Sequence, residues 1–230
     1  VGKKLVMGLT GLFLISFLVI HVGLNSTIYN DLFFFDPADD GKMFNLAAHF
    51  MGASYVIRII EVFLFIGFFI HIIQGYVLEV QNRKKRGINY KVKMGTRGSR
   101  WYSKSMGLLG TLLLLFLVMH ISHFWVPSRV TMDLPGRQYV PGGAEVHDLF
   151  SRMVDVFQDP WIVVLYVIGC ISLGWHLLHG FQATFRTMGV YNKKYIKLAK
   201  AAGIIFSILV PLLFALMPIS MYMGWVGYGN

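Results

Sequence analysis

The sequence predicts an all-α polytopic membrane protein whose five transmembrane helices form one bundle. The first observation is composition, because the 230 residues are 56% hydrophobic and only 14% charged, whereas soluble domains carry about 25% charged residues. The second is the presence of five apolar runs, each long enough to supply the roughly 20 residues that a spanning helix needs. The third is a set of histidines that lie deep inside four of these runs.

The predicted spans follow one another along residues 1–230 as a single membrane domain. They are Leu5–Leu24, Tyr55–Val80, Ser105–Val126, Trp161–Phe185 and Ala199–Tyr222. The chain begins at Val1 rather than Met, which indicates a trimmed N-terminus, and the first run is too long for a cleaved signal peptide. The fifth run has no histidine, and we expect it to serve as a packing partner.

Charge is distributed unevenly over the links between spans. Basic residues fill the links after the second and fourth spans, and most acidic residues lie in the other two. By the positive-inside rule, the N-terminus is then cytoplasmic and the C-terminus outside. We interpret the basic links as topology signals that contact anionic lipid, or alternatively as a docking surface for cytoplasmic proteins. Nucleic acid is not an expected partner.

Both outer links contain a predicted short helix. The link 26–54 ends in FNLAAHFMGASY, which is typical of a helix at the membrane interface, and the link 127–160 ends in a predicted surface helix from Ala144 to Phe157. We expect Pro127 to close the third span. The chain has one cysteine, Cys170, so it can form neither an internal disulfide nor a cysteine-ligated metal cluster.

Four histidines lie deep in four different spans, where an imidazole is costly unless something binds it. From the nearest cytoplasmic basic residue, a rise of 1.5 Å per residue places His71 and His176 at depths of roughly 18 and 15 Å. The same calculation places His21 and His120 at depths of roughly 26 and 24 Å. Two histidines at one depth on different helices can ligate one iron from its two faces. The sequence therefore predicts two bis-histidine hemes, one held by His71 and His176 and the other by His21 and His120.

Other residues remain open as heme contacts. His123 and His179 each lie three residues from a predicted ligand, so they could replace it or reach a propionate or a quinone. Depth favours His120 and His176 over them. We expect His49 and His147 to be surface residues. Further candidates for propionate contacts near the inner face are Arg97, Trp101 and Lys193. Small residues expected to leave room for a flat cofactor are Gly8, Thr10, Gly11, Gly67, Gly75, Gly110, Gly169 and Gly174.

Two charged residues lie near the outer end of the second span. Arg58 and Glu61 are three residues apart, so they share a helix face and could form an ion pair. They lie at the depth of His21 and His120, and quinone reduction consumes protons as well as electrons. We therefore consider them catalytic candidates for a quinone site, which His49 could join. The alternative is an intramembrane ion pair with no further role.

The chain resembles the five-span, di-heme cytochrome b subunit of bacterial succinate:quinone oxidoreductases, which include succinate dehydrogenases and fumarate reductases. The similar stretches run almost end to end in the same order. They are FLVIHVGLN, FNLAAHFM, RIIEVF, FFIHIIQGYV, LVMHISHFW and YVIGCISLGWHLLHGF. The resemblance implies that His21 and His120 ligate the distal heme b and that His71 and His176 ligate the proximal one.

The resemblance also implies partners and a location. A flavoprotein subunit with FAD and an iron–sulfur subunit would sit on the cytoplasmic side of a bacterial inner membrane, and the dicarboxylate site would lie in that flavoprotein. This chain would be the sole anchor, embedded in the lipid bilayer, and would exchange electrons with a quinone, usually menaquinone in this family. The complex could also dimerise.

Three other readings stay open at this point. One is a di-heme anchor of another quinone-linked dehydrogenase, such as a hydrogenase or formate dehydrogenase. A second is an ion transporter that uses buried His and Glu, which would contain no heme and be colourless. The third is a structural scaffold, in which each deep histidine would tolerate Leu.

Overall fold

The computed structural model describes residues 2–32, 35–36, 38–86, 105–139, 141–189 and 192–228. The fold is all-α, and five helical segments are long and apolar enough to cross a membrane. The long helices are α1 (Gly2–Asn25), α3 (Tyr55–Arg86), α5 (Met106–His120), α7 (Pro160–Thr187) and α8 (Lys193–Tyr222). They confirm the predicted helical bundle. Arg97 and Trp101, and most of the basic link after α3, lie outside the described residues.

The third helical segment is longer than the sequence indicated. It continues beyond His120 through two π-helical stretches, η2 (Ile121–Trp125) and η3 (Pro127–Thr131). We expected Pro127 to close the span, but the helical segment continues past it. This proline lies inside the continuous helical segment at the start of η3, and the His123 backbone oxygen, four residues before it, accepts from Arg152 Nε instead. The segment thus carries its side chains to Thr131 before the chain turns.

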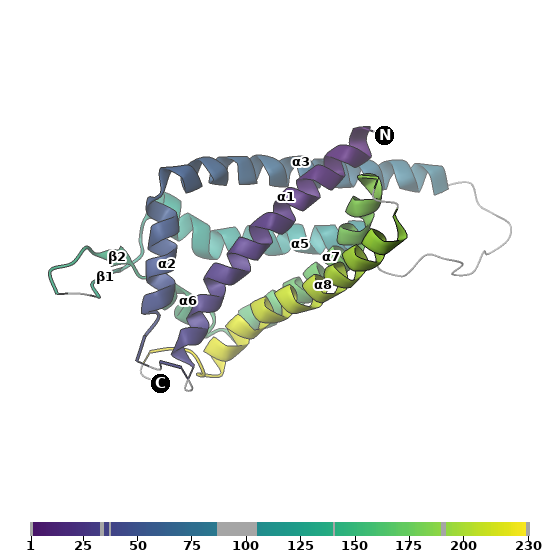
Figure 1. The fold of residues 1–230 in the computed structure, drawn as a ribbon. Coiled ribbons are helices and arrows are strands. Elements are labelled where there is room, and N and C mark those ends of the chain that lie inside the picture. Colours follow the sequence, from purple (N-terminus) through teal and green to yellow (C-terminus); the bar gives the residue numbers. More distant parts are fainter. Residues whose placement is uncertain are drawn as a thin grey trace.

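The five long helices lie alongside one another, with α1 running obliquely across the bundle (Figure 1). Helix α7 contacts α1, α5 and α8, and α1 also contacts α3. The N-terminus lies at one end of the bundle, together with the C-terminal end of α3 (Figure 1). Helices α2 and α6, the β1–β2 pair and the C-terminus gather at the opposite end, which we call the cap end (Figure 1).

Large apolar side chains cover the outward faces of the long helices. On α3 these include Ile59, Phe63 and Phe69, and on α8 they include Ile205 and Ile208, all of them more than half exposed. A soluble protein rarely presents contiguous apolar surface of this extent. The outward faces are therefore suited to contact with lipid, in agreement with a multi-pass membrane protein.

Helix α8 packs closely along α7, as expected for a packing partner. A Cβ atom at Gly174 would lie 3.1 Å from the backbone oxygen of Ser207. A Cβ atom at Gly203 would lie 2.6 Å from the Phe181 ring. The glycines on both helices therefore let backbone and aromatic ring approach more closely than any larger residue would allow.

The cap end contains the short elements. These are η1 (Ser26–Asp31), α2 (Lys42–Ala53), β1 (Gly136–Arg137), β2 (Val146–His147) and α6 (Leu149–Val156). The predicted interfacial helix FNLAAHFM is α2. The helix predicted to begin at Ala144 begins only at Leu149, because residues 146 and 147 pair with β1 in an antiparallel ladder. Asp148 then caps α6 by accepting from the Ser151 N–H at 3.0 Å.

A buried hydrogen-bond network joins α2 to α6 and to the C-terminal segment. The fully buried Asn45 amide donates to the Tyr139 hydroxyl at 2.6 Å and to Asp148 Oδ1 at 2.7 Å. Its carbonyl accepts from the Phe150 N–H at 3.0 Å. The Tyr228 hydroxyl donates to Asp148 Oδ2 at 2.8 Å. Burial raises the pKa of Tyr228, and the neighbouring Asp148 raises it further, so this phenol keeps its proton.

Arg137 adds a cation to this network. Its guanidinium lies 5.3 Å from the ring centre of Tyr139 and 5.0 Å from that of Tyr228, within range for cation–π attraction. It also pairs with Asp148 Oδ2 at 3.9 Å and donates to the Asp40 backbone oxygen at 2.9 Å. Burial opposes the charge, but these neighbours together raise the pKa of Arg137. The cap is therefore held by polar contacts as well as by apolar packing.

We predict that Asn45→Leu lowers the free energy of unfolding by about 1–3 kcal/mol, since it leaves buried partners such as the Phe150 N–H unsatisfied. Lys42→Ala is the matched control, because Lys42 lies on the same helix and its side chain is exposed. Unfolding of the detergent-solubilised chain, followed by circular dichroism, measures both. Equal stability of the two variants would show that the network does not hold the cap.

Candidate functional site

The structure brings the four deep histidines together as two pairs. The rings of His21 on α1 and His120 on α5 have centroids 5.8 Å apart, with an angle of 87° between their planes. The rings of His71 on α3 and His176 on α7 have centroids 6.2 Å apart, at 63°. An imidazole nitrogen binds a first-row metal ion at about 2 Å, so two rings on opposite sides of one ion have centroids about 6 Å apart. Both pairs have this separation.

The two pairs lie at different levels of the bundle. The distance between these levels is about the same along α1 and along α5. On α1, Thr10 contacts His71, and Thr10 precedes His21 by eleven residues, or roughly 16 Å along a helix. On α5, a Cβ atom at Gly110 would lie 3.9 Å from the His176 ring. Gly110 precedes His120 by ten residues, or roughly 15 Å along a helix. The His21–His120 pair is the one nearer the cap end.

In the His71–His176 pair, α1 contributes the nearest polar contact. The Thr10 hydroxyl oxygen lies 3.2 Å from His71 Nδ1. A Cβ atom at the next residue, Gly11, would lie 3.6 Å from His71 Cε1. Across the pair, Nδ1 of His176 is buried and has no hydrogen-bond partner among the described residues. One ring is therefore anchored by a hydroxyl group, whereas the other has an unpaired buried nitrogen.

The His21–His120 pair is built in a similar way. The Asn25 amide donates to the His21 backbone oxygen at 2.8 Å and lies 3.3 Å from His21 Nδ1. His120 lies between two aromatic rings, with centroid distances of 5.7 Å to Phe116 and 5.4 Å to Phe124. Its Nδ1 is buried without a partner in the part of the chain that the structure describes. Each pair thus contains one unpaired buried nitrogen.

These features fit a bis-histidine heme site better than other metal centres. A buried imidazole nitrogen without a partner costs about 1–3 kcal/mol, and neutral imidazole is the most common metal ligand in proteins. Over the described residues, no three His, Cys, Asp or Glu side chains gather closely enough to hold a metal ion. A pair of imidazoles alone matches the two axial positions that a heme iron offers to a protein.

Most of the glycines expected to make room for a flat cofactor serve helix packing instead. A Cβ atom at Gly67 would lie 2.9 Å from the Phe13 ring, and one at Gly169 would overlap the Phe116 ring. Gly174 lies against the α8 backbone. Gly11 and Gly110 are the ones that border a histidine ring. The expectation was therefore right about close approach, but the approaching group at Gly67 and Gly169 is a phenylalanine.

The remaining histidines lie outside the two pairs. His123 lies one turn beyond His120, and its Nδ1 is 3.1 Å from the Tyr166 hydroxyl. Its backbone oxygen accepts from Arg152 Nε at 3.1 Å. His49 and His147 are exposed at the cap end, as expected. His179 follows His176 by one turn of α7.

Glu61 lies in a polar cluster near the cap end of α3. Its carboxylate accepts a hydrogen bond from Trp125 Nε1 and lies 3.8 Å from Arg129 Nε. Arg58, which by its spacing could pair with Glu61, instead donates to the Gly52 backbone oxygen at 3.2 Å. Sequence reasoning placed Trp125 inside the third span but missed it as a partner, because spacing along one helix does not show which residue of another helix it faces. It missed Arg129 because it ended that span at Val126, whereas η3 continues past Arg129.

A groove of about 310 Å³ surrounds this cluster. It is lined by Arg58, Glu61, Val62, Phe65, Trp125 and Arg129. The groove thus combines one carboxylate, two guanidinium groups and apolar or aromatic walls. This composition is typical of a site for a ligand with a polar head and an apolar body.

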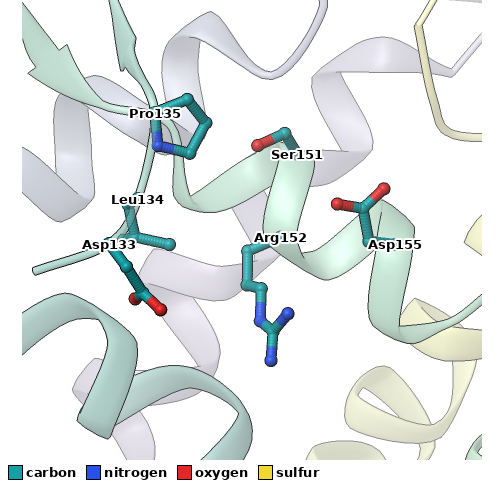
Figure 2. A pocket seen from close by; sticks show the side chains of 6 residues that line it. All are labelled: Asp133, Leu134, Pro135, Ser151, Arg152 and Asp155. Carbon is teal, nitrogen blue, oxygen red and sulfur yellow. The ribbon is translucent and has the colours of Figure 1, made fainter. Parts of the chain in front are cut away.

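A second, smaller cavity of about 130 Å³ lies within the cap end (Figure 2). Residues on α6 and in the segment before β1 line it, namely Asp133, Leu134, Pro135, Ser151, Arg152 and Asp155. The Arg152 side chain extends between Asp133 and Asp155 (Figure 2). This cavity is less than half the volume of the Glu61 groove and has no apolar wall comparable to Phe65 and Trp125.

Comparison of the chain with known protein families, with curated proteins and with solved structures gives no match.

We predict that Gly169→Ala disturbs the His120 site, because the new methyl group overlaps the Phe116 ring that stacks on His120. Overpacking of this kind costs about 1–3 kcal/mol of stability. Gly180→Ala is the control on the same helix, since a Cβ atom there meets nothing within 4 Å. Thermal unfolding of the two variants should differ clearly, and an unchanged Gly169→Ala chain would contradict the packing described.

Proposed function

We propose that this chain is the di-heme cytochrome b anchor of a succinate:quinone oxidoreductase. In this role it passes electrons between an iron–sulfur subunit and membrane quinone. The observation that carries the proposal is the pairing of four histidines from four helices into two bis-histidine sites. The order and spacing of the stretches around these histidines, which resemble that family, support the same conclusion.

Each pair has a defined role in the proposal. His21 and His120 would hold the distal heme, and His71 and His176 the proximal one. A bound heme would supply reversible one-electron chemistry at a potential set by its ligands and their surroundings. The chain's own contribution is to present neutral imidazoles from fixed helices and to keep water away with aromatic neighbours such as Phe116 and Phe124.

The dicarboxylate reaction would take place in another chain. Cys170 is the only cysteine and is buried in α7, so this chain cannot hold an iron–sulfur cluster. A flavoprotein with FAD and an iron–sulfur subunit would dock at the end of the bundle that carries the N-terminus, which we place on the cytoplasmic side of a bacterial inner membrane. The basic residues of that end support this placement.

The Glu61 groove is the proposed quinone site, and menaquinone is the proposed substrate. Reduction of a quinone adds a proton to each ring oxygen, and Glu61 can carry such a proton. Arg129 and Trp125 hold the Glu61 carboxylate in place, while Phe65 and Val62 offer an apolar wall to the ring and tail. Trp125 lies five residues beyond His120, so the groove is near the distal pair.

We predict that the purified chain binds two low-spin b-type hemes. A pyridine hemochrome assay gives the ratio of heme to protein, and a reduced-minus-oxidised spectrum gives the heme type. Replacement of His120 or of His176 by Leu should each remove one heme, whereas His147→Leu, an exposed control, should retain both. A colourless wild-type chain would overturn the proposal and favour the ion-transporter reading.

We also predict that Glu61→Gln slows electron exchange with quinol about 100-fold or more while both hemes remain bound, because a lost proton acceptor typically costs 10²–10⁴ in rate. Stopped-flow reduction of the heme-loaded chain by a water-soluble naphthoquinol measures the rate. Glu79→Gln is the control, since Glu79 lies on the same helix and pairs with Arg83 at 2.7 Å. Equal rates for the two variants would place the quinone elsewhere.

A further inference from the structure

Thr10 is a small residue that the resemblance leaves without a role. Its hydroxyl oxygen lies within hydrogen-bond range of three atoms. Two are the backbone oxygens of Val6 at 2.9 Å and of Met7 at 3.2 Å. The third is His71 Nδ1 at 3.2 Å.

A hydroxyl group has one proton and two lone pairs. The backbone oxygens of Val6 and Met7 can only accept, so at least one of these short contacts requires the Thr10 proton. If that proton pointed to His71, two pairs of oxygen atoms would face each other at 2.9 and 3.2 Å with no hydrogen between them. With its single proton shared between the two backbone oxygens in a bifurcated hydrogen bond, the Thr10 hydroxyl can only accept from its third partner, which is then His71 Nδ1–H at 3.2 Å.

The tautomer of His71 follows from this direction. A neutral imidazole carries one proton, so a proton on Nδ1 leaves Nε2 with a free lone pair. We propose that Thr10 is a positioning residue that fixes His71 in the Nδ1–H tautomer and so keeps its Nε2 available to a metal. This inference rests on the proposed function for the identity of the ligand, but not for the tautomer itself.

The surroundings of the contact between Thr10 and His71 support this role. Gly11 borders the His71 ring beside Thr10, since a Cβ atom there would lie in ordinary van der Waals contact with Cε1. The bond also ties α1 to α3. Partners of this kind, which hold the second nitrogen of a ligating histidine, orient the ring and make it a more basic ligand.

The other pair has no matching contact. The polar group nearest to His21 Nδ1 is the Asn25 amide nitrogen, 3.3 Å away on the same helix, and its shorter hydrogen bond, at 2.8 Å, goes to the His21 backbone oxygen. Thr10, in contrast, reaches His71 from another helix and accepts. Only the His71–His176 pair therefore has, among the described residues, a ring whose Nδ1 proton is held by a cross-helix acceptor.

The first test uses the heme-free full-length chain in lipid nanodiscs, with ¹⁵N-labelled histidine. Nitrogen–proton correlation spectra distinguish the two neutral tautomers, and His71→Gln identifies the His71 signals by their loss. We expect the Nδ1–H tautomer in the wild type and in Thr10→Ser, and a mixture in Thr10→Val, which preserves the shape of the side chain. Thr187→Val is the matched control. Like Thr10, Thr187 donates to a backbone oxygen of its own helix, that of Ala183, but among the described residues it has no hydrogen bond to a histidine.

The second test uses the heme-loaded chain. Loss of the acceptor makes His71 a less basic ligand, so Thr10→Val should raise the midpoint potential of one heme and leave the other unchanged. A tenfold change in the reduction equilibrium corresponds to about 59 mV for a one-electron couple. Thr10→Ser should restore the wild-type value. A merely structural role would not give this pattern of rescue.

The outcomes separate this inference from the proposed function. A wild-type His71 in the Nε2–H tautomer, or a tautomer that Thr10→Val leaves unchanged, overturns the role of Thr10 even if two hemes are bound. Conversely, a chain that binds no heme overturns the proposed function, while the nitrogen spectra still decide the role of Thr10.

Discussion

The constraint on which this structure depends is the cost of a polar nitrogen in a medium that offers it no water. Each deep imidazole must either find a hydrogen-bond partner or bind something else. His71 and His21 have protein partners for Nδ1, whereas the Nδ1 atoms of His120 and His176 have none within the described part of the chain. Helices from four parts of the sequence are arranged so that an anchored ring faces an unanchored one in each pair.

Helix α7 is the element that makes this arrangement possible. It contacts α1, α5 and α8, and it carries His176 on the side of α3 and Gly169 beneath the Phe116 ring that stacks on His120. Gly169 on α7 thus supports the His21–His120 pair by packing, whereas His176 of α7 is a member of the His71–His176 pair. Helix α8, which has no histidine, packs along α7, and Gly174 lies against the α8 backbone.

Much of this structure could be predicted from the sequence, because the features concerned depend only on lengths and distances along the chain. Hydrophobic length and charge distribution locate the spans, and a constant rise per residue converts the distance from a basic anchor into a depth. That conversion grouped the same histidines that the structure brings together, His21 with His120 and His71 with His176. Whether iron joins them stays a prediction.

The remaining features depend on three-dimensional geometry that no spacing rule contains. Pro127 is a helix breaker in most contexts, so no sequence signal extended the third span to Arg129, and Arg58 was the cation nearest to Glu61 along the chain. The hydroxyl of Thr10 meets His71 only because α1 and α3 cross at that level. Glycine positions indicate close approach, but they do not say whether a phenylalanine or a ligand fills the space.

The bond from Tyr228 to Asp148 bears on how the chain is assembled in a membrane. Asp148 belongs to the segment between α5 and α7, whereas Tyr228 follows α8. During synthesis the N-terminal spans emerge first, so Asp148 is made before the residue that donates to its Oδ2. The cap therefore cannot complete its hydrogen bonds until α8 has been inserted and Tyr228 has reached Asp148.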